Sequence, residues 1–259
     1  MVILELFIFI FLGLICGSFA SAIAHREERG MKWWSLGGGQ ERSACSSCQN
    51  ALQAQDLIPI FSWLRHKGHC RQCGAKMSPA YLALELGCAL AALAVYLVHG
   101  LSIESVFLIL ALPFLAALTV VDIRQMILPN RLVLILGVLG LVRLIVEGFV
   151  FQIIDPVFVG ANHVLAAFLY GGFAFMLGKI FTVILKKDAL GFGDVKFFAV
   201  AGLWLGLMRL PEFCILAGVL GVVFALVWRA TTNERVFPFG PSLIASFYGL
   251  LLLESSLFL

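Results

Sequence analysis

The stretch 2-VILELFIFIFLGLICGSFASAIA-24 contains one charged residue, Glu5, in an otherwise almost wholly apolar run. About 20 such residues are enough for a helix to cross the hydrocarbon core of a bilayer. No basic segment precedes the run, and it is longer than the apolar region of a secretory signal peptide. We therefore interpret 2–24 as a membrane-spanning helix, which indicates that the whole chain is a membrane protein.

The composition of the whole chain is also that of a membrane protein. Of the 259 residues, 61% are hydrophobic and 13% are charged, and the mean hydropathy is +1.02. A soluble globule of this length cannot bury so much apolar surface. Windows of about 20 residues predict an all-α polytopic membrane protein with eight transmembrane helices, at 2–24, 80–98, 103–121, 127–146, 161–185, 195–209, 212–230 and 241–259.

The prediction divides the chain into three parts: the first transmembrane helix (1–24), a polar extramembrane module (25–79) and a seven-helix membrane domain (80–259). Most of the 18 basic residues lie in the module and in the connections that eight spans place on the same side. Basic residues concentrate in cytoplasmic connections. We therefore expect a cytoplasmic module and both chain termini outside.

The module carries two C-x-x-C pairs, with 21 residues between them. Each pair can present two thiolates on one side of a tight turn, so the two pairs suit a tetrahedral Zn²⁺. Four thiolates close such a site, which favours a structural over a catalytic metal. The alternatives are four unrelated reduced cysteines, or substitution of one ligand by a neighbouring histidine. The candidate ligands are Cys45, Cys48, Cys70 and Cys73, with His66 and His69 beside the second pair.

Two acidic residues occur at predicted cytoplasmic helix ends. Asp122 follows an apolar run in 118-LTVVDIRQMILPN-130, and Asp194 opens the sixth span in 191-GFGD-194. Two close carboxylates cannot both ionise cheaply, so one of them keeps a proton. Such a pair can activate water with one group and protonate a leaving amide nitrogen with the other. If the bundle brings the two together, the pair has the chemistry of an aspartic protease.

The glycines before Asp194 support the same hypothesis. Gly191 and Gly193 permit positive φ and leave no side-chain wall, so a substrate backbone can approach the acid. The structural alternative is that Asp194 caps a helix N-terminus while Asp122 is solvated. Asp188 is a rival partner, although it follows two lysines in a loop. Secondary candidates are Glu85, inside the second span, and Lys196, beside the glycine motif.

Taken together, these motifs resemble the bacterial type IV prepilin peptidases, which are bifunctional leader peptidase/N-methyltransferases within the GxGD class of intramembrane aspartyl proteases. The resemblance covers nearly the whole chain. Its segments are 17-GSFASAIAHR-26, 58-IPIFSWLRHKGHC-70, 78-SPAYLALEL-86, 121-VDIRQMILPN-130, 191-GFGDVKFFAVAGLWLG-206 and 237-FPFGP-241, with the doubled C-x-x-C enclosing the second.

The resemblance implies catalytic roles for Asp122 and Asp194 and zinc binding by the four cysteines. It also implies a location in the bacterial inner membrane. The implied substrates are prepilins of type IV pili or pseudopilins of type II secretion, cut after a glycine at the cytoplasmic face. S-adenosylmethionine would then methylate the new N-terminus. Lipid is the surrounding medium, and no nucleic-acid partner is expected.

The chain departs from the family pattern at Phe192, at Leu57 and over 27–44. The last two departures fall in the module that the family associates with methylation, so a protease without methyltransferase activity is one alternative. Others are an ion-coupled transporter and a non-catalytic assembly factor. Acids near the membrane midplane and inverted repeats would favour a transporter, but neither pattern is visible. The doubled C-x-x-C argues against the signal-peptide-peptidase branch of the GxGD enzymes.

Overall fold

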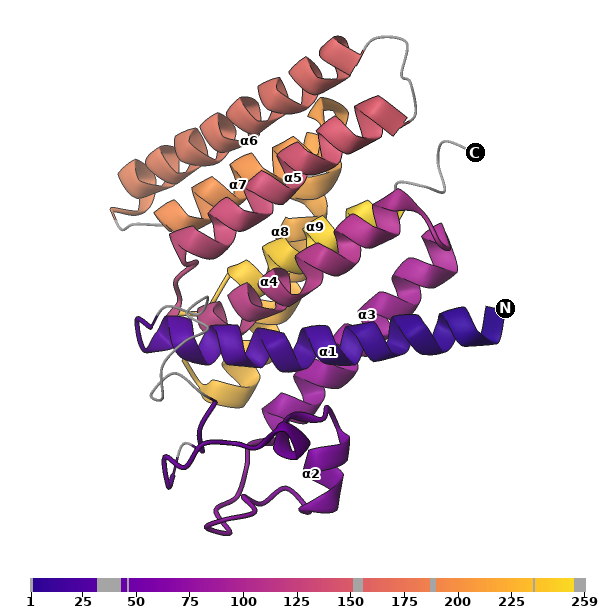
Figure 1. Ribbon diagram of the computed structural model, residues 1–259. Coiled ribbons are helices and arrows are strands. Elements are labelled where there is room, and N and C mark those ends of the chain that lie inside the picture. Colours follow the sequence, from indigo (N-terminus) through magenta and orange to yellow (C-terminus); the bar gives the residue numbers. More distant parts are fainter. Residues whose placement is uncertain are drawn as a thin grey trace. The chain divides into compact units, whose positions relative to one another are not determined.

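The computed structural model describes residues 2–31, 43–45, 47–150, 156–186, 190–234 and 236–253. Within these ranges the chain is helical and has no strand, with two isolated bridges in the module. The all-α fold class is therefore confirmed (Figure 1). The chain forms two compact units, one of Met1–Leu101 with Leu108–Ala117, the other of Ser102–Phe107 with Leu118–Leu259.

Eight long helices follow the eight predicted spans, to within a few residues wherever the structure describes both ends. The last six residues of the final predicted span lie outside the described part. The long helices are α1 (Val2–Glu28), α3 (Pro79–His99), α4 (Ile103–Gln125), α5 (Asn130–Val150), α6 (Pro156–Leu185), α7 (Phe192–Leu205), α8 (Leu210–Thr232) and α9 (Gly240–Leu253); the short elements are η1 (Ala54–Leu57), α2 (Phe61–Arg65) and η2 (Leu207–Arg209).

Five of the described helical segments are long and apolar enough to cross a membrane: α1, α3, α4, most of α6, and η2 with α8. The count of eight spans remains a prediction. Helices α7 and α9 have 14 residues each, which corresponds to about 21 Å of rise against a hydrocarbon core of about 30 Å. Helix α5 is long but carries Arg131, Arg143 and Glu147.

In the first unit, α1 and α3 cross at glycines (Figure 1). Gly13 and Gly17 lie four residues apart on one face of α1. A Cβ on Gly13 would lie 2.6 Å from the Cα of Ala89, and one on Gly17 would lie 2.5 Å from the Cα of Glu85. Small residues at this spacing let two membrane helices approach closely. The contact brings Glu85 beside Ser18, whose hydroxyl hydrogen-bonds its carboxylate.

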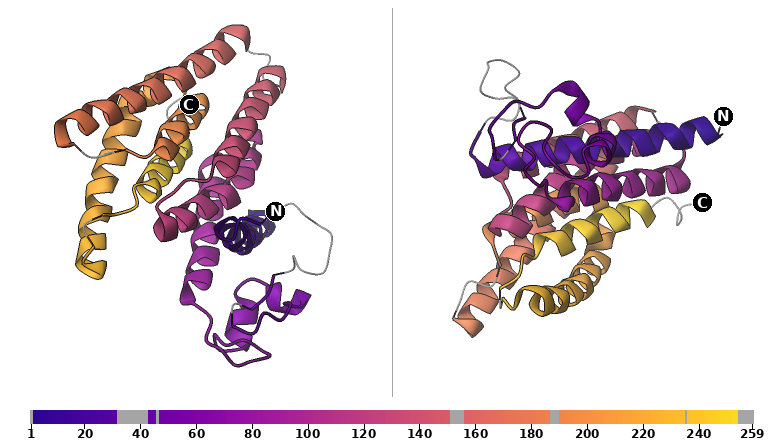
Figure 2. Two further views of the ribbon diagram at one scale, coloured as in Figure 1. Left: turned by 90° about the vertical axis from the view of Figure 1, so that its left-hand side faces the viewer. Right: turned by 90° about the horizontal axis from the view of Figure 1, so that it is seen from below.

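In the second unit, α7 is the central helix. It contacts α5, α6 and α9, and the views in Figure 2 show α8 and α9 as neighbours. Trp204 and Phe197 of α7 both meet Phe247 of α9 edge to face, with ring centroids 5.9 and 5.5 Å apart. Such pairs contribute about 0.5–1.5 kcal/mol each beyond the burial of their area. This packing fixes α7, and with it the Asp194 at its first turn.

The far end of α7 explains how so short a helix can end among apolar neighbours. The hydroxyl of Tyr170 donates to the carbonyl of Gly206 at 3.0 Å. A ring nitrogen of His163 lies 2.9 Å from the carbonyl oxygen of Leu203. Arg143 donates to the following carbonyl at 3.4 Å. The last carbonyls of a helix have no partner within it and are costly to leave unpaired away from water. Side chains of α5 and α6 supply the missing donors.

Candidate active site and metal site

The module gathers the four predicted cysteines into one cluster. Their sulfur atoms all lie within 4.8 Å of one another, and Sγ of Cys45 is 3.9 Å from Sγ of Cys73. Tetrahedral Zn²⁺ with Zn–S bonds of about 2.3 Å requires sulfurs about 3.8 Å apart. The cluster is therefore able to hold a metal ion such as zinc. Among the described residues, neither His66 nor His69 belongs to it.

Two turns with the same hydrogen bonds build the cluster. In the first, the N–H of Cys45 donates to the carbonyl of Asn50, and the N–H of Gln49 donates back to that of Cys45. The second turn repeats both bonds: the N–H of Cys70 donates to the carbonyl of Ala75, and the N–H of Gly74, the fifth residue counted from Cys70, donates to the carbonyl of Cys70. The fifth residue has positive φ in both turns, 58° at Gln49 and 69° at Gly74. The two C-x-x-C pairs thus form two copies of one turn.

The first turn also prepares the sulfur atom of Cys45 for a cation. The backbone N–H groups of Cys48 and Ser47 point at the sulfur of Cys45, the latter at 3.4 Å, and lower the pKa of that thiol to about 6. A thiolate, rather than a thiol, binds metal. The local backbone therefore favours the thiolate form of Cys45.

Asp122 lies in the last turn of α4, and its surroundings do not fit the alternative of a solvated helix end. Only 4% of its surface is exposed, so it is not a solvated helix end. One carboxylate oxygen, Oδ2, accepts the backbone N–H of Gly240 at 2.8 Å. The helix stops immediately afterwards, at Met126, whose φ is 55°. The turn that follows brings Leu128 back towards this carboxylate, as described below.

Asp194 lies in the first turn of α7. Its carboxylate accepts the N–H of Gly191 at 3.2 Å, and its own N–H donates to the carbonyl of Gly191 at 3.1 Å. A capping contact is therefore present, as the structural alternative required, but Gly191 is the N-cap residue and Asp194 is the third residue of the helix. Capping does not exclude chemistry, because this bond occupies one of the two carboxylate oxygens. The residue is half-buried, whereas Gly191 is exposed.

The two aspartates belong to the same region of the second unit. A Cβ on Gly193 would lie 3.1 Å from the Cβ of Leu128, and one on Gly240 would lie 3.1 Å from Cδ2 of the same leucine. Gly240 is the donor to Asp122, and Gly193 is the neighbour of Asp194. Leu128 thus links the glycines next to the two acids. The arrangement offers two carboxylates at adjoining ends of α4 and α7.

One predicted reason for the glycines is wrong. Gly191 has a φ of −66°, and neither it nor Gly193 is among the glycines of positive φ in the described residues. Gly193 lies inside the helix and is small because Leu128 packs against its backbone. The motif therefore serves close packing rather than an unusual backbone conformation.

The secondary candidates differ in their contacts. Lys196 donates to the side-chain oxygen of Asn130 at 2.7 Å, and its ammonium group lies 4.6 Å from the ring centroid of Phe192. It ties the start of α7 to the start of α5. Glu85 belongs to the other unit, where its Oε2 accepts the N–H of Ile60 at 2.7 Å. It therefore contacts both the module and Ser18 of the membrane helix α1.

Sequence reasoning missed Gly240 as a site residue. It is 118 residues from Asp122, and a Cβ at this position would lie 2.5 Å from Oδ2 of that aspartate. The only signal was the segment 237-FPFGP-241, which carried part of the family resemblance without an assigned role. The rival acid Asp188 lies outside the described residues.

Comparisons with known proteins identify the family of the chain. Residues 11–99 match the Bacterial Peptidase A24 N-terminal domain, and residues 109–226 match the Type IV leader peptidase family. The chain belongs to the type IV leader peptidase family. The first match includes the four cysteines, and the second includes both aspartates.

Individual relatives show the same relationship. The chain is 32% identical to a prepilin leader peptidase/N-methyltransferase of Pectobacterium carotovorum subsp. carotovorum, over 93% of this chain and 91% of the relative. It is 36% identical to a type 4 prepilin-like proteins leader peptide-processing enzyme of Escherichia coli O78:H11 (strain H10407 / ETEC), over 78% of this chain and 72% of the relative. A prepilin leader peptidase/N-methyltransferase of Aeromonas salmonicida (strain A449) is 33% identical over 81% and 71%. No solved structure matches the chain.

Family membership confirms the prediction of a peptidase, and with the five apolar helices it makes the chain a multi-pass membrane protein. The roles of individual residues and the side of the membrane remain to be proposed.

Proposed function

We propose that the protein is a membrane aspartyl endopeptidase that removes the basic leader of prepilins or pseudopilins at the cytoplasmic face. Asp122 and Asp194 activate the attacking water and protonate the leaving amide nitrogen. The observation that carries this proposal is the link through Leu128, which joins the glycine beside Asp194 to the glycine bonded to Asp122.

The chemistry requires the two carboxylates to hold one proton between them. Coupled carboxylates release their protons in two steps that belong to the pair, so one acid remains protonated when the other ionises. The ionised group takes a proton from water as its oxygen attacks the scissile carbonyl. The protonated group then gives its proton to the amide nitrogen as the C–N bond breaks. Each aspartate has one backbone donor, which orients it and leaves its second oxygen available for substrate.

The orientation follows from charge. Most basic residues lie in the module and in connections on its side, which supports a cytoplasmic module, termini outside, and an inner-membrane location. The apolar segment of the substrate then lies among the helices, while its basic leader stays in the cytoplasm. Zinc held by the four cysteines folds the module and takes no part in hydrolysis.

The names of the relatives also support methylation of the new N-terminus by this chain. S-adenosylmethionine, when bound, would supply the methyl group from its sulfonium sulfur. A chain that cleaves without methylating is the alternative. Mass spectrometry of the processed substrate separates the two, because it reports the cut site and one added methyl group together.

The experiment that tests the peptidase is co-expression of a prepilin with Asp122→Asn or Asp194→Asn, followed by measurement of leader removal. We expect each variant to lose at least about 10³-fold in cleavage rate, because removing one member of a catalytic unit disables the unit. Asp188→Asn is the matched control and keeps cleavage if the assignment is correct. Full cleavage by both Asp122 and Asp194 variants would end the proposal.

Two other classes give different results. A non-catalytic assembly factor tolerates both aspartate substitutions and fails when the cysteines are replaced. A proton-coupled carrier cleaves no leader at all, whichever acid is present. Purified protein with purified prepilin therefore separates the peptidase from both alternatives, and the cysteine variants separate the alternatives from each other.

A further inference from the structure

The extramembrane module exposes a short apolar face on and just before α2. Ile58, Phe61 and Leu64 follow one another at intervals of three residues, and they are 45%, 54% and 59% exposed. Residues three apart are neighbours on the surface of a helix. The proposed peptidase chemistry gives these side chains no role. Exposed apolar side chains that gather on one face mark an interaction surface.

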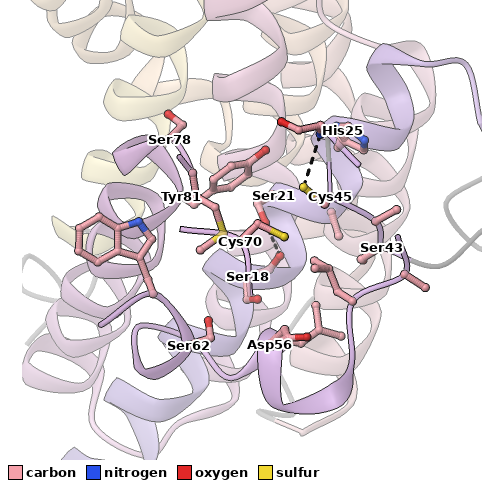
Figure 3. Close-up of a pocket in the computed structure, with 18 of the residues that line it drawn as sticks. Ser18, Ser21, His25, Ser43, Cys45, Asp56, Ser62, Cys70, Ser78 and Tyr81 are labelled. Carbon is pink, nitrogen blue, oxygen red and sulfur yellow. Dashed lines mark hydrogen bonds between the residues drawn. The ribbon is translucent and has the colours of Figure 1, made fainter. Parts of the chain in front are cut away.

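The other side of the same segment is turned inward. Ser62 and Trp63 line a cavity of about 690 Å³ between α1, the module and the start of α3. Figure 3 shows Ser62 at this cavity together with Asp56 and Ser18. Ile58, Phe61 and Leu64 lie outside the lining. The segment 58–64 therefore has one face turned to the interior of the first unit and one apolar face turned away from it.

We infer that this apolar face inserts into the cytoplasmic leaflet of the membrane that α1 and α3 cross. Acyl chains contact the three apolar side chains, and anionic headgroups contact the basic residues that follow them. The assignment to the cytoplasmic leaflet rests on the orientation proposed above, whereas insertion itself does not. Depth, backbone hydrogen bonding and charge all favour lipid as the occupant.

Two membrane helices hold the segment at the depth of the membrane boundary. Oε2 of Glu85 in α3 accepts the N–H of Ile60 at 2.7 Å, and the same carboxylate accepts the hydroxyl of Ser18 in α1. Ser18 lies about 9 Å before the end of the predicted span 2–24, and Glu85 lies about 8 Å after the start of the predicted span 80–98. Interfacial helices bury their apolar face about 5–10 Å into the boundary between headgroups and acyl chains. Ile60 is therefore at the depth where such a face inserts.

The backbone of the segment is suited to an apolar medium. The N–H groups of Ser62 and Leu64 donate to the carbonyls of Ile58 and Ile60 at 3.1 and 2.9 Å. Ile60, whose φ is 60°, gives its own N–H to the carboxylate of Glu85. An N–H group without an acceptor is costly away from water. These bonds let the segment lie beside lipid without that cost.

The charge of the segment favours anionic lipid over the basic leader of the substrate. Residues 57–84 include four basic residues and no acidic one. Two of the four, Arg65 and Lys67, are exposed and come directly after the apolar face. Basic residues beside a membrane are attracted to the anionic headgroups of the cytoplasmic leaflet, and their long stems let the charge reach the headgroups while apolar neighbours insert. The same charges repel a basic peptide.

The test replaces Phe61 by p-benzoylphenylalanine, a photoreactive analogue, in the full-length, zinc-loaded protein. The protein is irradiated in vesicles of phosphatidylglycerol and phosphatidylcholine in equal parts. We expect lipid adducts at a yield close to that of the same analogue at Leu90, an exposed residue of α3 within its predicted span. Gln72, exposed in the second cysteine turn, is the matched control in the module and should give several-fold less. A yield at residue 61 as low as that at residue 72, with abundant adduct at residue 90, would overturn the inference.

Arg65→Gln combined with Lys67→Gln tests the contact with headgroups. In the anionic vesicles, insertion should weaken by up to about fivefold for each charge removed, and the yield of lipid adducts at residue 61 should fall. In vesicles of phosphatidylcholine alone, the same two substitutions should leave the yield unchanged. An equal loss in both kinds of vesicle would contradict the role of the two charges.

Other occupants of the face would give different adducts. If added prepilin replaces lipid in the adducts at residue 61, the face binds substrate and the inference is wrong. Adducts to a second copy of this chain would overturn it in the same way. Leader cleavage in the same vesicles tests the proposed function separately. Cleavage without lipid adducts at residue 61 refutes only the insertion, and lipid adducts without cleavage refute only the peptidase.

Discussion

The cysteine cluster and the aspartate region are built in opposite ways. All four cysteines lie between residues 45 and 73, in two turns that repeat the same hydrogen bonds. The aspartate region joins residues 122, 194 and 240, which meet only because the C-terminal end of α4 belongs to the same unit as α7 and α9. A local site depends on turn geometry, whereas a long-range site depends on packing. The two should therefore fail under different substitutions.

The largest expected effect is on the local site. Cys70→Ser should reduce bound zinc from one ion per chain to none, because structural zinc supplies about 10–16 kcal/mol of apparent binding energy that the module needs to fold. Atomic emission of the purified protein measures the metal. Leader cleavage should remain well above that of either aspartate variant, since the aspartate region contains no module residue. Loss of cleavage equal to that of Asp194→Asn would show that the two regions are not separate.

The long-range site should fail at a residue with no reactive group. Gly240→Ala places a methyl group 2.5 Å from the present position of Oδ2 of Asp122, which is too close, so the carboxylate must shift. Displacing a catalytic group by about 1 Å can cost about 10²-fold in rate, and we expect a loss of that order in leader cleavage. Gly249→Ala in the same helix is the control, because nothing lies within 4 Å of its Cβ position. Equal rates for the two variants would remove Gly240 from the site.

Gly193→Ala should have a smaller effect. Its Cβ would lie 3.1 Å from that of Leu128, a contact that a small shift of the leucine relieves. We expect cleavage to fall about tenfold, within the range of about 1–3 kcal/mol that overpacking costs. Gly172→Ala, which has open space at its Cβ position in α6, should change nothing. A rate above wild type for Gly193→Ala would contradict the packing role.

The smallest effects compare the two cysteine turns. Gly74→Ala introduces a side chain at a φ of 69°, whereas Gln49→Gly relieves one at 58°. Left-handed backbone costs a non-glycine residue about 1–2 kcal/mol. Zinc competition with a chromophoric chelator should therefore show affinity about five- to tenfold weaker for Gly74→Ala and modestly stronger for Gln49→Gly. Changes in the same direction would mean that the turns are not equivalent.

The same contrast explains what the sequence could predict. Apolar length predicted the helices closely, since the bounds of α3 and α4 follow from Ser78 and Ser102 as N-caps and from apolar runs of spanning length. The spacing of the cysteines predicted their cluster, because the turn geometry is local. The number of spans stays a prediction, because α7 and α9 are too short to satisfy a length criterion alone.

Contacts between residues far apart in the chain could not be predicted from the sequence. Nothing near Gly240 in the sequence indicates that its N–H meets a carboxylate 118 residues earlier. The roles of Gly191 and Gly193 were predicted from backbone freedom, but the packing of Leu128 accounts for the second. The cavity beside Trp63 depends on how the module lies against α1 and α3, which no local pattern specifies. Their positions at helix ends singled out the two aspartates and the family resemblance implied their roles, but the geometry around them comes from the fold.

The most direct test of the central claim is a double-mutant cycle on leader cleavage with Asp122→Asn, Asp194→Asn and the pair. If the two carboxylates form one catalytic unit, the double variant should be no slower than the slower single variant, because either change already disables the unit. Losses that simply add in free energy, or a single variant that cleaves at the wild-type rate, would contradict a shared active site.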